Sequence, residues 1–406
     1  MKKIKLLIII SFICLGSLYS KPKNIIIMIA DGMGVNTMSF GDLIYDISEL
    51  KKFENYGFIK TASKESKYHI TDSAAAGTAM SCGQKTYRGI ISMDNNGKKL
   101  KSIAYLAKEK KKLIGIISNT RITHATPAVF YANNINRDDE QGIAKQIISS
   151  EFDLFMGGGY EYISGIEDDI KKSGYNLVRE MDELDKIKSD KIIATFSNSH
   201  MSYEIERNNT EPSLSEMANF ALRFLNRGKN GFFMSIESGR IDHCEHSNDA
   251  PCLAYEMKEF KKTLEVIFNF LSKNKDTLFI LLADHSNGGL SLGRDGNQIL
   301  NLDLLTRAKQ SSETFLNSLK NNISYKEFSN IYYNVYGVNI TEEDYEIIKG
   351  NNKLVLDPLN KVANIKWSTD EHEGSYVPLC STGPSSEIFK GIMDMDEIGK
   401  NLFKII

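Results

Sequence analysis

Several short segments of this 406-residue chain carry carboxylates and imidazoles at spacings that suit a metal ion. Asp242 and His246 are four residues apart, so on a helical turn their side chains share one face and can chelate one ion. Asp284 and His285 are adjacent and directly follow an apolar run at 278–283. Imidazoles and carboxylates without thiolates suit zinc, whereas all-oxygen sites suit magnesium. The residue types therefore predict a metal centre.

The placement of the histidines supports this prediction. The chain has seven histidines, and five of them fall in short motifs with acidic or hydroxyl residues, which random placement would not produce. One more carboxylate, Glu237, lies one turn or more upstream of Asp242 and could serve a second ion. The five clustered histidines are His124, His243, His246, His285 and His372.

One serine hydroxyl has unusually small neighbours. Ser73 lies in the run 71–79, which reads TDSAAAGTA, and a helix that begins there could point backbone N–H groups at an anion. Two structural interpretations stay open, because the serine could be only a helix N-cap and the small residues could simply allow close helix packing. The segment alone does not decide between a nucleophile and a structural role.

A further carboxylate, Asp31, follows the apolar run 24–30 and precedes Gly32, Met33 and Gly34. The two glycines would let a ligand approach the backbone closely. Asp-Gly is also an ordinary turn sequence, so this segment is weak evidence when it is taken alone.

The elements that would position these residues alternate along the chain. Apolar runs rich in Ile, Leu and Phe predict fully buried strands, and stretches with helical spacing lie between them. We expect an α/β fold with three layers, in which a doubly wound, mostly parallel sheet carries helices on both faces. Ligands of such folds collect at the carboxyl ends of the strands. The predicted strands are 24–30, 113–118, 152–156, 192–196, 232–236 and 278–283, and the predicted helices include 100–110, 140–150, 214–227 and 253–272.

The alternation loosens between 293 and 361, where Asn, Lys and Tyr are frequent, and resumes near Trp367. We interpret residues 21–406 as one catalytic domain with a small accessory lobe inserted at 293–361. Hydrophobic residues make up 41% of the chain and charged residues 25%, which is typical of soluble globular proteins. The formal net charge of −2 is too small to gather a polyanion over the whole surface, so we expect no nucleic-acid-specific binding.

The beginning of the chain has the composition of an export signal. Three lysines precede an apolar stretch at 6–15 and small residues follow it, so we expect residues 1–20 to be a signal peptide and the mature protein to be periplasmic or extracellular. The apolar stretch is short for a membrane span, which needs about 20 residues, although an uncleaved anchor stays open. We expect no span in the mature chain.

Four cysteines lie outside the predicted signal. None of them forms a CxxC pair, which argues against a zinc–thiolate site, and we expect buried or paired structural roles. A bridge between Cys244 and Cys252 is one candidate pairing.

Six motifs follow one another between residues 24 and 379. They are Asp31-Gly32-Met33-Gly34; Asp72-Ser73-Ala74-Ala75 with Thr78-Ala79; Thr126-Pro127-Ala128; Glu237 to His246; Ala283-Asp284-His285; and His372-Glu373-Gly374. Each motif alone is unspecific, but the ordered set makes the chain resemble the alkaline phosphatase family. The resemblance implies hydrolysis of phosphate monoesters at alkaline pH through a phosphoserine on Ser73, with two zinc ions and a third metal, magnesium.

The resemblance also implies roles for the site residues and a homodimeric assembly. Arg137, eleven residues after Thr126, would bind the phosphoryl group of the substrate. The zinc ligands would be Asp31, Asp284 and His285 at one site and Asp242, His246 and His372 at the other, while Asp31, Glu237 and Thr126 would bind magnesium, with His124 as a further candidate ligand.

The chain departs from the most familiar form of the family pattern at three positions. His124 and His243 stand where one branch of the family has an acidic residue and a lysine, and another branch has histidines. Because an imidazole suits magnesium less well than oxygen does, the identity of the third metal stays open. Asn133 replaces a histidine that is common in the family.

Two other classes of function share part of this pattern. Another hydrolase with the same metal-binding sheet, such as a phosphodiesterase, a sulfatase or a phosphomutase, would differ in the surroundings of Ser73 and in Arg137. A non-catalytic exported protein that binds phosphate or metal would have no reason to keep Ser73 in its small-residue run. The predicted site contacts only the phosphoryl group, so we expect a broad range of small phosphate monoesters as substrates.

Overall fold

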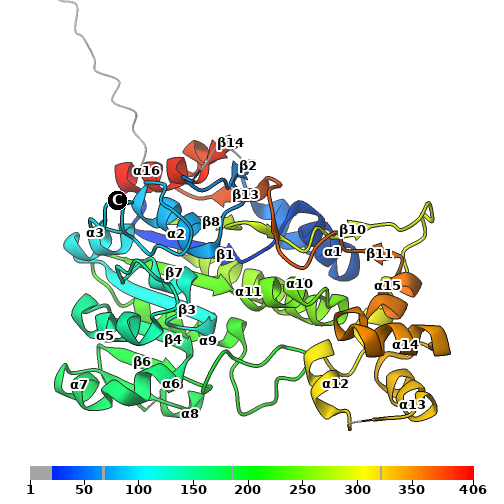
Figure 1. Ribbon diagram of the computed structural model, residues 1–406. Helices are drawn as coiled ribbons and strands as arrows, with labels where there is room; N and C mark the ends of the chain where they lie inside the picture. Colours follow the sequence, from blue (N-terminus) through cyan, green and yellow to red (C-terminus); the bar gives the residue numbers. More distant parts are fainter. Residues whose placement is uncertain (1–20, 66–68, 185, 188, 321) are drawn as a thin grey trace, which may run out of the picture.

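The computed structural model describes residues 21–65, 69–184, 186–187, 189–320 and 322–406. The predicted signal peptide lies outside these residues. Within them, ten strands form one sheet in the order β14-β2-β13-β8-β1-β7-β3-β4-β6-β5, and helices flank it (Figure 1). Strand β13 (Val377–Thr382) runs antiparallel to both of its neighbours, and all other pairings in this sheet are parallel. The predicted α/β class with a mostly parallel sheet is confirmed.

The centre of the sheet consists of strands that are buried along their whole length. These are β1 (Asn24–Ala30), β7 (Phe232–Ser238) and β8 (Thr277–Leu282), with β3 (Leu113–Arg121) beside them. Helices cover both faces of this part of the sheet, so its strands are continuous apolar runs rather than alternating ones. That is why the sequence predicted them within a few residues of their observed bounds.

On the far side of β3 lie β4 (Leu154–Gly158), β6 (Ile192–Thr195) and β5 (Asn176–Val178). The predicted strand 152–156 begins two residues too early. Asp153 lies at the start of this pairing: its carboxylate accepts from the Ile114 N–H at 2.7 Å, and its own N–H donates to the Ile114 carbonyl oxygen at 3.1 Å.

The opposite edge of the sheet was not predicted from the sequence. Strand β2 (Asn55–Lys60) pairs with β14 (Gly391–Asp394) and alternates exposed with more buried residues, so it lacks a continuous apolar run. At Gly57 an added Cβ would lie 2.2 Å from the Gly391 carbonyl oxygen, so only glycine permits this close pairing.

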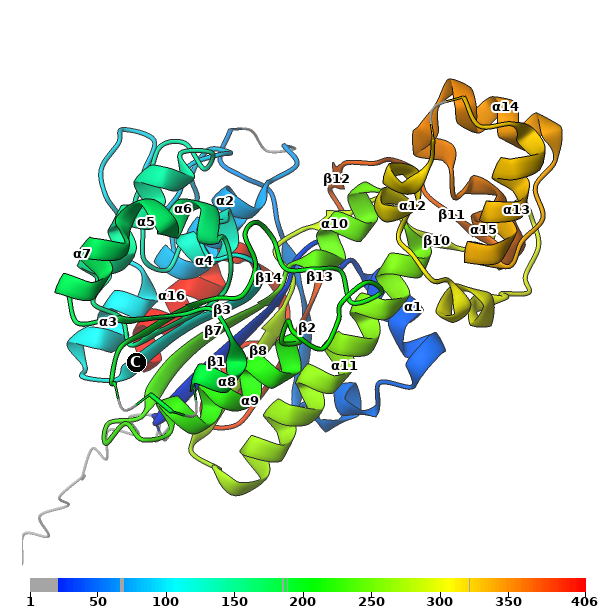
Figure 2. The same ribbon diagram turned by 90° about the horizontal axis from the view of Figure 1, so that it is seen from below.

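Helices lie on both faces of the sheet (Figure 2). One face carries α2 (Ser73–Cys82), α3 (Ile103–Glu109), α4 (Ala125–Ala128) and α16 (Met395–Ile405), and the other carries α9 (Leu214–Leu225) and α11 (Ala250–Lys273). Helix α11 begins three residues before the predicted start because Asp249 caps the Cys252 N–H and Pro251 occupies the first turn. The other helices before β8 are α1 (Val35–Tyr45), α5 (Glu140–Ser150), α6 (Tyr160–Ile163), α7 (Glu167–Lys172), α8 (Met181–Leu184) and α10 (Arg240–His246).

A group of helices lies beside one end of the sheet, between β10 (Ser291–Leu292) and β11 (Ile365–Lys366) (Figure 2). Its helices are α12 (Ser312–Ser318), α13 (Tyr325–Tyr336), α14 (Glu342–Gly350) and α15 (Asp357–Ala363). Aromatic side chains pack its interior, with Phe315 in contact with Phe328, Tyr332 and Tyr336. Its status as an accessory lobe of a single catalytic domain stays a prediction.

A disulfide between Cys244 and Cys252 joins α10 to the first turn of α11, with Cα atoms 5.6 Å apart. Cys82 and Cys380 are free thiols. Among the described residues, no helix has both the length and the apolar character needed to cross a bilayer.

Candidate active site and metal centre

Three neighbouring strands bring carboxylates from distant parts of the sequence together at the carboxyl ends of the strands. Strand β1 lies between β7 and β8, and all three run parallel. Asp31 directly follows β1, Glu237 is the penultimate residue of β7, and Asp284 lies two residues after β8. The carboxyl ends of parallel strands are the expected ligand site of such a sheet.

The first group of candidate metal ligands, called here the buried cluster, consists of Asp31, Asp284 and His285. One ligand atom from each residue lies within 4.8 Å of the others, and all three residues are buried. His285 Nε2 is 3.3 Å from Asp31 Oδ1 and 3.4 Å from Asp284 Oδ2. Burial and the nearby carboxylates, first of all Asp284, raise the pKa of Asp31 well above its ordinary value. Burial likewise raises the pKa of Asp284 and lowers that of His285, so this group is poorly stabilised without a cation.

The second group, called here the open cluster, consists of Asp242 and His246 from α10 and His372 from β12 (His372–Glu373). The predicted four-residue spacing places His246 Nε2 3.4 Å from Asp242 Oδ2. His372 Nε2 is 3.7 Å from Asp242 Oδ1. The side chain of His246 is 34% exposed, so this cluster faces solvent.

Backbone carbonyls orient both histidines of the open cluster. His246 Nδ1 lies 2.8 Å from the Asp370 carbonyl oxygen, and His372 Nδ1 lies 3.0 Å from the Thr71 carbonyl oxygen. A carbonyl can only accept, so each Nδ1 carries the proton and each Nε2 is free to bind a cation. Asn287, which the sequence did not indicate, donates to Asp242 Oδ1 at 2.7 Å and fixes the carboxylate as well.

The third group consists of Asp31, His124 and Glu237. Thr126 Oγ1 donates to Asp31 Oδ2 at 3.3 Å, so the predicted threonine also lies here. Ser118 and Thr120, on the polar end of β3, donate to Glu237 Oε2 and were not predicted. Burial raises the pKa of Glu237 to about 6.

Buried polar atoms without hydrogen bonds show that these residues fit bound cations. Three such atoms are carboxylate oxygens of the predicted ligands, and leaving acceptors of this kind unpaired in the interior is unfavourable. Coordination of a divalent cation would satisfy them. Within the described chain they are Asp31 Oδ1, Glu237 Oε1 and Asp284 Oδ2.

Ser73 is the first residue of α2 and lies beside the buried cluster. Its Oγ is 3.2 Å from His285 Nε2, and the residue is only 2% exposed. The helix N-cap is Asp72, whose carboxylate accepts from the Ala75 N–H at 3.0 Å, so the alternative in which Ser73 is only an N-cap is wrong. Close packing does contribute, because a Cβ at Gly77 would lie 2.9 Å from the Val129 side chain.

Arg137 approaches the same helix start. Its Nη1 is 3.1 Å from Asp72 Oδ2, and its Nη2 is 3.1 Å from His124 Nε2. Although burial opposes the charged form, Arg137 and two backbone N–H groups lower the pKa of Asp72. Asn133 is remote from this contact and donates to the carbonyl oxygens of Ser92 and Leu100, which gives it a structural role.

Three imidazoles, called here the histidine group, lie together beside Arg137. His124 is 5.4 Å from His200 and 5.8 Å from His243 between ring centroids, and His200 is 4.5 Å from His243. Burial and adjacent arginines lower the pKa of His124 and His243 well below the ordinary value and that of His200 to about 2. His200 was missed because it belongs to no recognisable motif.

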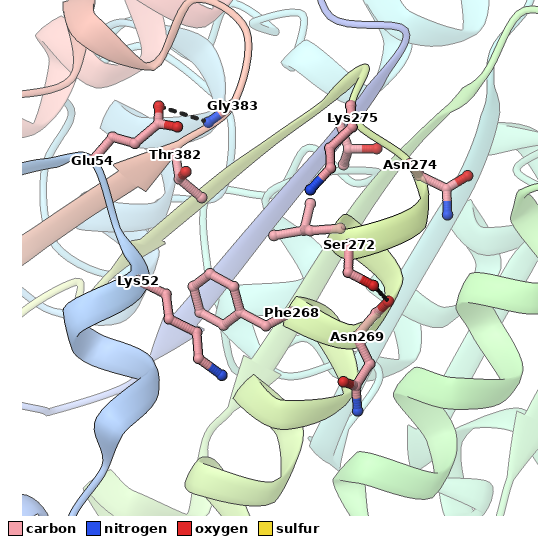
Figure 3. A pocket seen from close by; sticks show the side chains of 11 residues that line it. Lys52, Glu54, Phe268, Asn269, Ser272, Asn274, Lys275, Thr382 and Gly383 are labelled. Carbon is pink, nitrogen blue, oxygen red and sulfur yellow. Dashed lines mark hydrogen bonds between the residues drawn. The ribbon is translucent and has the colours of Figure 1, made fainter.

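A separate hollow of about 470 Å³ lies at the other end of the strands from the candidate metal ligands (Figure 3). Lys52, Phe268 and Lys275 line it together with Thr277, the first residue of β8. Since β8 begins here, the hollow is at the amino ends of the parallel strands. It contains none of the predicted site residues.

Comparisons with known proteins agree with this arrangement. A model of the alkaline phosphatase family matches residues 22–406. Alkaline phosphatases 3 and 4 of Bacillus subtilis (strain 168) are 32% and 30% identical to the chain, each over 95% of its length and over 89% and 88% of their own.

Solved structures show the same fold. The cold-active alkaline phosphatase of Shewanella sp. superposes with a TM-score of 0.86 at 26% identity, covering 94% of this chain and 99% of that one. The Thermus thermophilus alkaline phosphatase also gives 0.86, at 27% identity, covering 95% of this chain and 91% of that one. Because the family model spans nearly the whole sequence, the chain belongs to the alkaline phosphatase family of phosphatase enzymes.

Proposed function

We propose that this protein hydrolyses small phosphate monoesters at alkaline pH through a phosphoserine on Ser73. The observation that carries the proposal is the position of the Ser73 hydroxyl, 3.2 Å from a ligand atom of the buried cluster and at the start of a helix. The open cluster is adjacent, because the His285 and His372 rings stack with centroids 3.6 Å apart. One hydroxyl is thus within reach of two groups of metal ligands.

We assign zinc to the buried and open clusters and magnesium to the third group. The first two offer imidazole with carboxylate, and the third adds oxygen ligands from Glu237 and Thr126. When bound, the cations would stabilise negative charge on the attacking and leaving oxygens of the displacement.

The protein's own residues would carry the two displacements. The Ser73 hydroxyl gives up its proton to solvent and Oγ bonds to phosphorus while the bond to the substrate alcohol breaks. The alcohol oxygen takes up a proton from solvent as it leaves. Arg137 is already held by Asp72 and His124, so its remaining N–H groups can bind two phosphoryl oxygens with little loss of conformational freedom. Water then replaces Ser73 on phosphorus and releases phosphate. Two displacements retain configuration.

Two neighbouring structures bear on the metal preference of the third site. In the alkaline phosphatase of the Antarctic bacterium TAB5, with a TM-score of 0.72 and 27% identity, variants with glutamate or aspartate in place of one histidine have magnesium bound in the M3 site. By analogy, His124 would make the third site of this protein a weaker magnesium site than an acidic residue would.

We also retain two proposals about the whole protein. Residues 1–20 would direct export to the periplasm or the exterior, and the mature chain would form a homodimer. Cell fractionation and sedimentation equilibrium, respectively, test these proposals independently of the chemistry.

The test of function combines metal analysis with a substrate panel. We expect the purified protein to contain zinc, to release phosphate from an aryl phosphate at alkaline pH, to lose this activity in a chelator and to regain it with zinc. Comparison of monoester, diester and sulfate-ester substrates separates the rival hydrolases. A fully metal-loaded protein that releases no phosphate, or that prefers a diester or sulfate ester, would contradict the proposal.

A further inference from the structure

One buried arginine near the proposed active site has no carboxylate partner. Arg240 is 8% exposed, and no acidic side chain within the described residues forms an ion pair with it. By contrast, Arg121 pairs with Glu140 and Arg137 pairs with Asp72. A buried unpaired charge is strongly unfavourable, so the missing partner requires an explanation.

The contacts of Arg240 hold the guanidinium in place without neutralising it. It stacks on the Tyr203 ring at 3.5 Å, and Nη1 lies 2.6 Å from His243 Nδ1, while Nε is buried without an acceptor. Glu256 feels the charge of Arg240, which opposes the rise in its pKa caused by burial, but the two side chains form no ion pair. Its two oxygens already accept from the Glu204 backbone N–H and the Asn119 side chain.

Arg240 is connected to the proposed phosphoryl site through the histidine group alone. His243 contacts the rings of His124 and His200, and His124 in turn contacts Arg137. All three imidazoles are half-buried rather than fully enclosed. Because Nδ1 of His243 accepts from Arg240, its Nε2 carries the proton and is a second donor.

We propose that Arg240, with His243, forms a second anion subsite that takes a further phosphate group carried by the leaving group of the substrate. A guanidinium fork beside the His243 Nε2–H group matches the oxygens of a phosphate. This inference rests on the proposed function, because it takes Arg137 as the group that holds the reacting phosphoryl. It predicts that, among the substrates the site accepts, those with a second phosphate are preferred, of which pyrophosphate is the smallest.

The experiment compares pyrophosphate with phenyl phosphate in a metal-buffered solution. The variants are Arg240→Gln, Arg240→Lys and the control Arg227→Gln, whose arginine also stacks on an aromatic ring, Phe224 at 3.9 Å, but lies at the surface beside Asp190. We expect the ratio of kcat/KM for pyrophosphate to that for phenyl phosphate to fall at least about tenfold in Arg240→Gln. Arg240→Lys should show a smaller fall, because lysine keeps the charge but lacks the guanidinium fork, and Arg227→Gln should keep the whole ratio.

An unchanged ratio in Arg240→Gln, or equal losses on both substrates, would overturn the subsite. Should Arg240→Gln fail to fold by circular dichroism, His243→Ala carries the same comparison, because it removes the imidazole N–H group of the subsite. Titration with inorganic phosphate tests the subsite separately from hydrolysis: a second bound phosphate per chain that Arg240→Gln loses supports the subsite, and a second phosphate that Arg240→Gln keeps overturns its assignment to Arg240.

Failure of the proposed function would look different. If the wild-type protein hydrolyses neither substrate, calorimetry with methylenebisphosphonate, which cannot be hydrolysed, still tests the subsite. Tenfold weaker binding to Arg240→Gln than to Arg227→Gln would support the subsite without catalysis, and equal binding would overturn it.

Discussion

Two regions of the molecule bury carboxyl groups, and they handle the charge differently. At the strand ends, Asp31, Glu237 and Asp284 each leave one buried oxygen without a hydrogen bond, and imidazoles converge on them. On α11, Glu256 is equally buried, but both of its oxygens accept N–H groups. The first arrangement is incomplete without a cation, whereas the second is complete within the protein.

The comparison shows that burial alone does not identify a functional carboxyl group. Burial and the neighbouring Glu204 raise the pKa of Glu256 to about 8, a larger shift than that of Glu237. The two regions differ in the atoms that surround each carboxyl group. At the strand ends, carboxylate oxygens face other acceptors, whereas on α11 the oxygens of Glu256 face N–H donors.

The largest effect should follow from removing the hydroxyl at the strand ends. We expect Ser73→Ala to lower kcat/KM for an aryl phosphate by about 10³-fold or more, since the nucleophile is lost while the metal ligands remain. Metal content, measured by atomic emission, should stay at the wild-type value. Near-normal turnover in this variant would show that Ser73 is not the nucleophile.

A matched amide substitution in each region tests the comparison directly. Asp284→Asn should release metal from the buried cluster and reduce activity by about 100-fold or more, because an amide oxygen is a weaker ligand than a carboxylate. Glu256→Gln should keep the full metal content. Equal metal content in both variants would break the distinction between the two regions.

A substitution in the third group of ligands should strengthen metal binding rather than weaken it. His124→Asp should bind magnesium about tenfold more tightly in a calorimetric titration, because magnesium prefers oxygen ligands. His200→Asp is the control, since His200 belongs to the histidine group but to none of the three ligand groups. If both variants gain magnesium affinity equally, added negative charge and not coordination by residue 124 is the cause.

The smallest expected effect is a change with pH in the thermal stability of the protein, caused by Glu256 on α11. The pKa of Glu256 is about 8 in the folded protein and about 4.5 in the unfolded chain. Its contribution to the free energy of unfolding is therefore fully present below about pH 4.5 and is lost as the pH rises through about 8. Because glutamine keeps only one of the two acceptor oxygens, we expect Glu256→Gln to unfold at a lower temperature than the wild type at pH 4 to 5, and we expect this difference to shrink by a few degrees or reverse at pH 9. Parallel melting curves at both pH values would show that Glu256 does not titrate in this range.

How much the sequence could predict depended on whether a residue's partners were local. Asp242 and His246 share one helical turn, and the buried runs of β1 and β8 carry a continuous apolar signal. Strands β2 and β14 carry no such signal, because they pair at the edge of the sheet. His200 and Arg240 could not be predicted as site residues, because only their contacts in the folded protein place them near the site.

The position of β1 in the middle of the sheet has a consequence for biogenesis. The side chain of Asn24 accepts from the backbone of Phe232, 208 residues further along the chain, and His372 comes later still. During synthesis, almost the entire polypeptide must therefore be made before Asp31 and the other candidate metal ligands can come together. We expect folding to be slow, since long loops close before the central pairings form, and metal capture to be a late event.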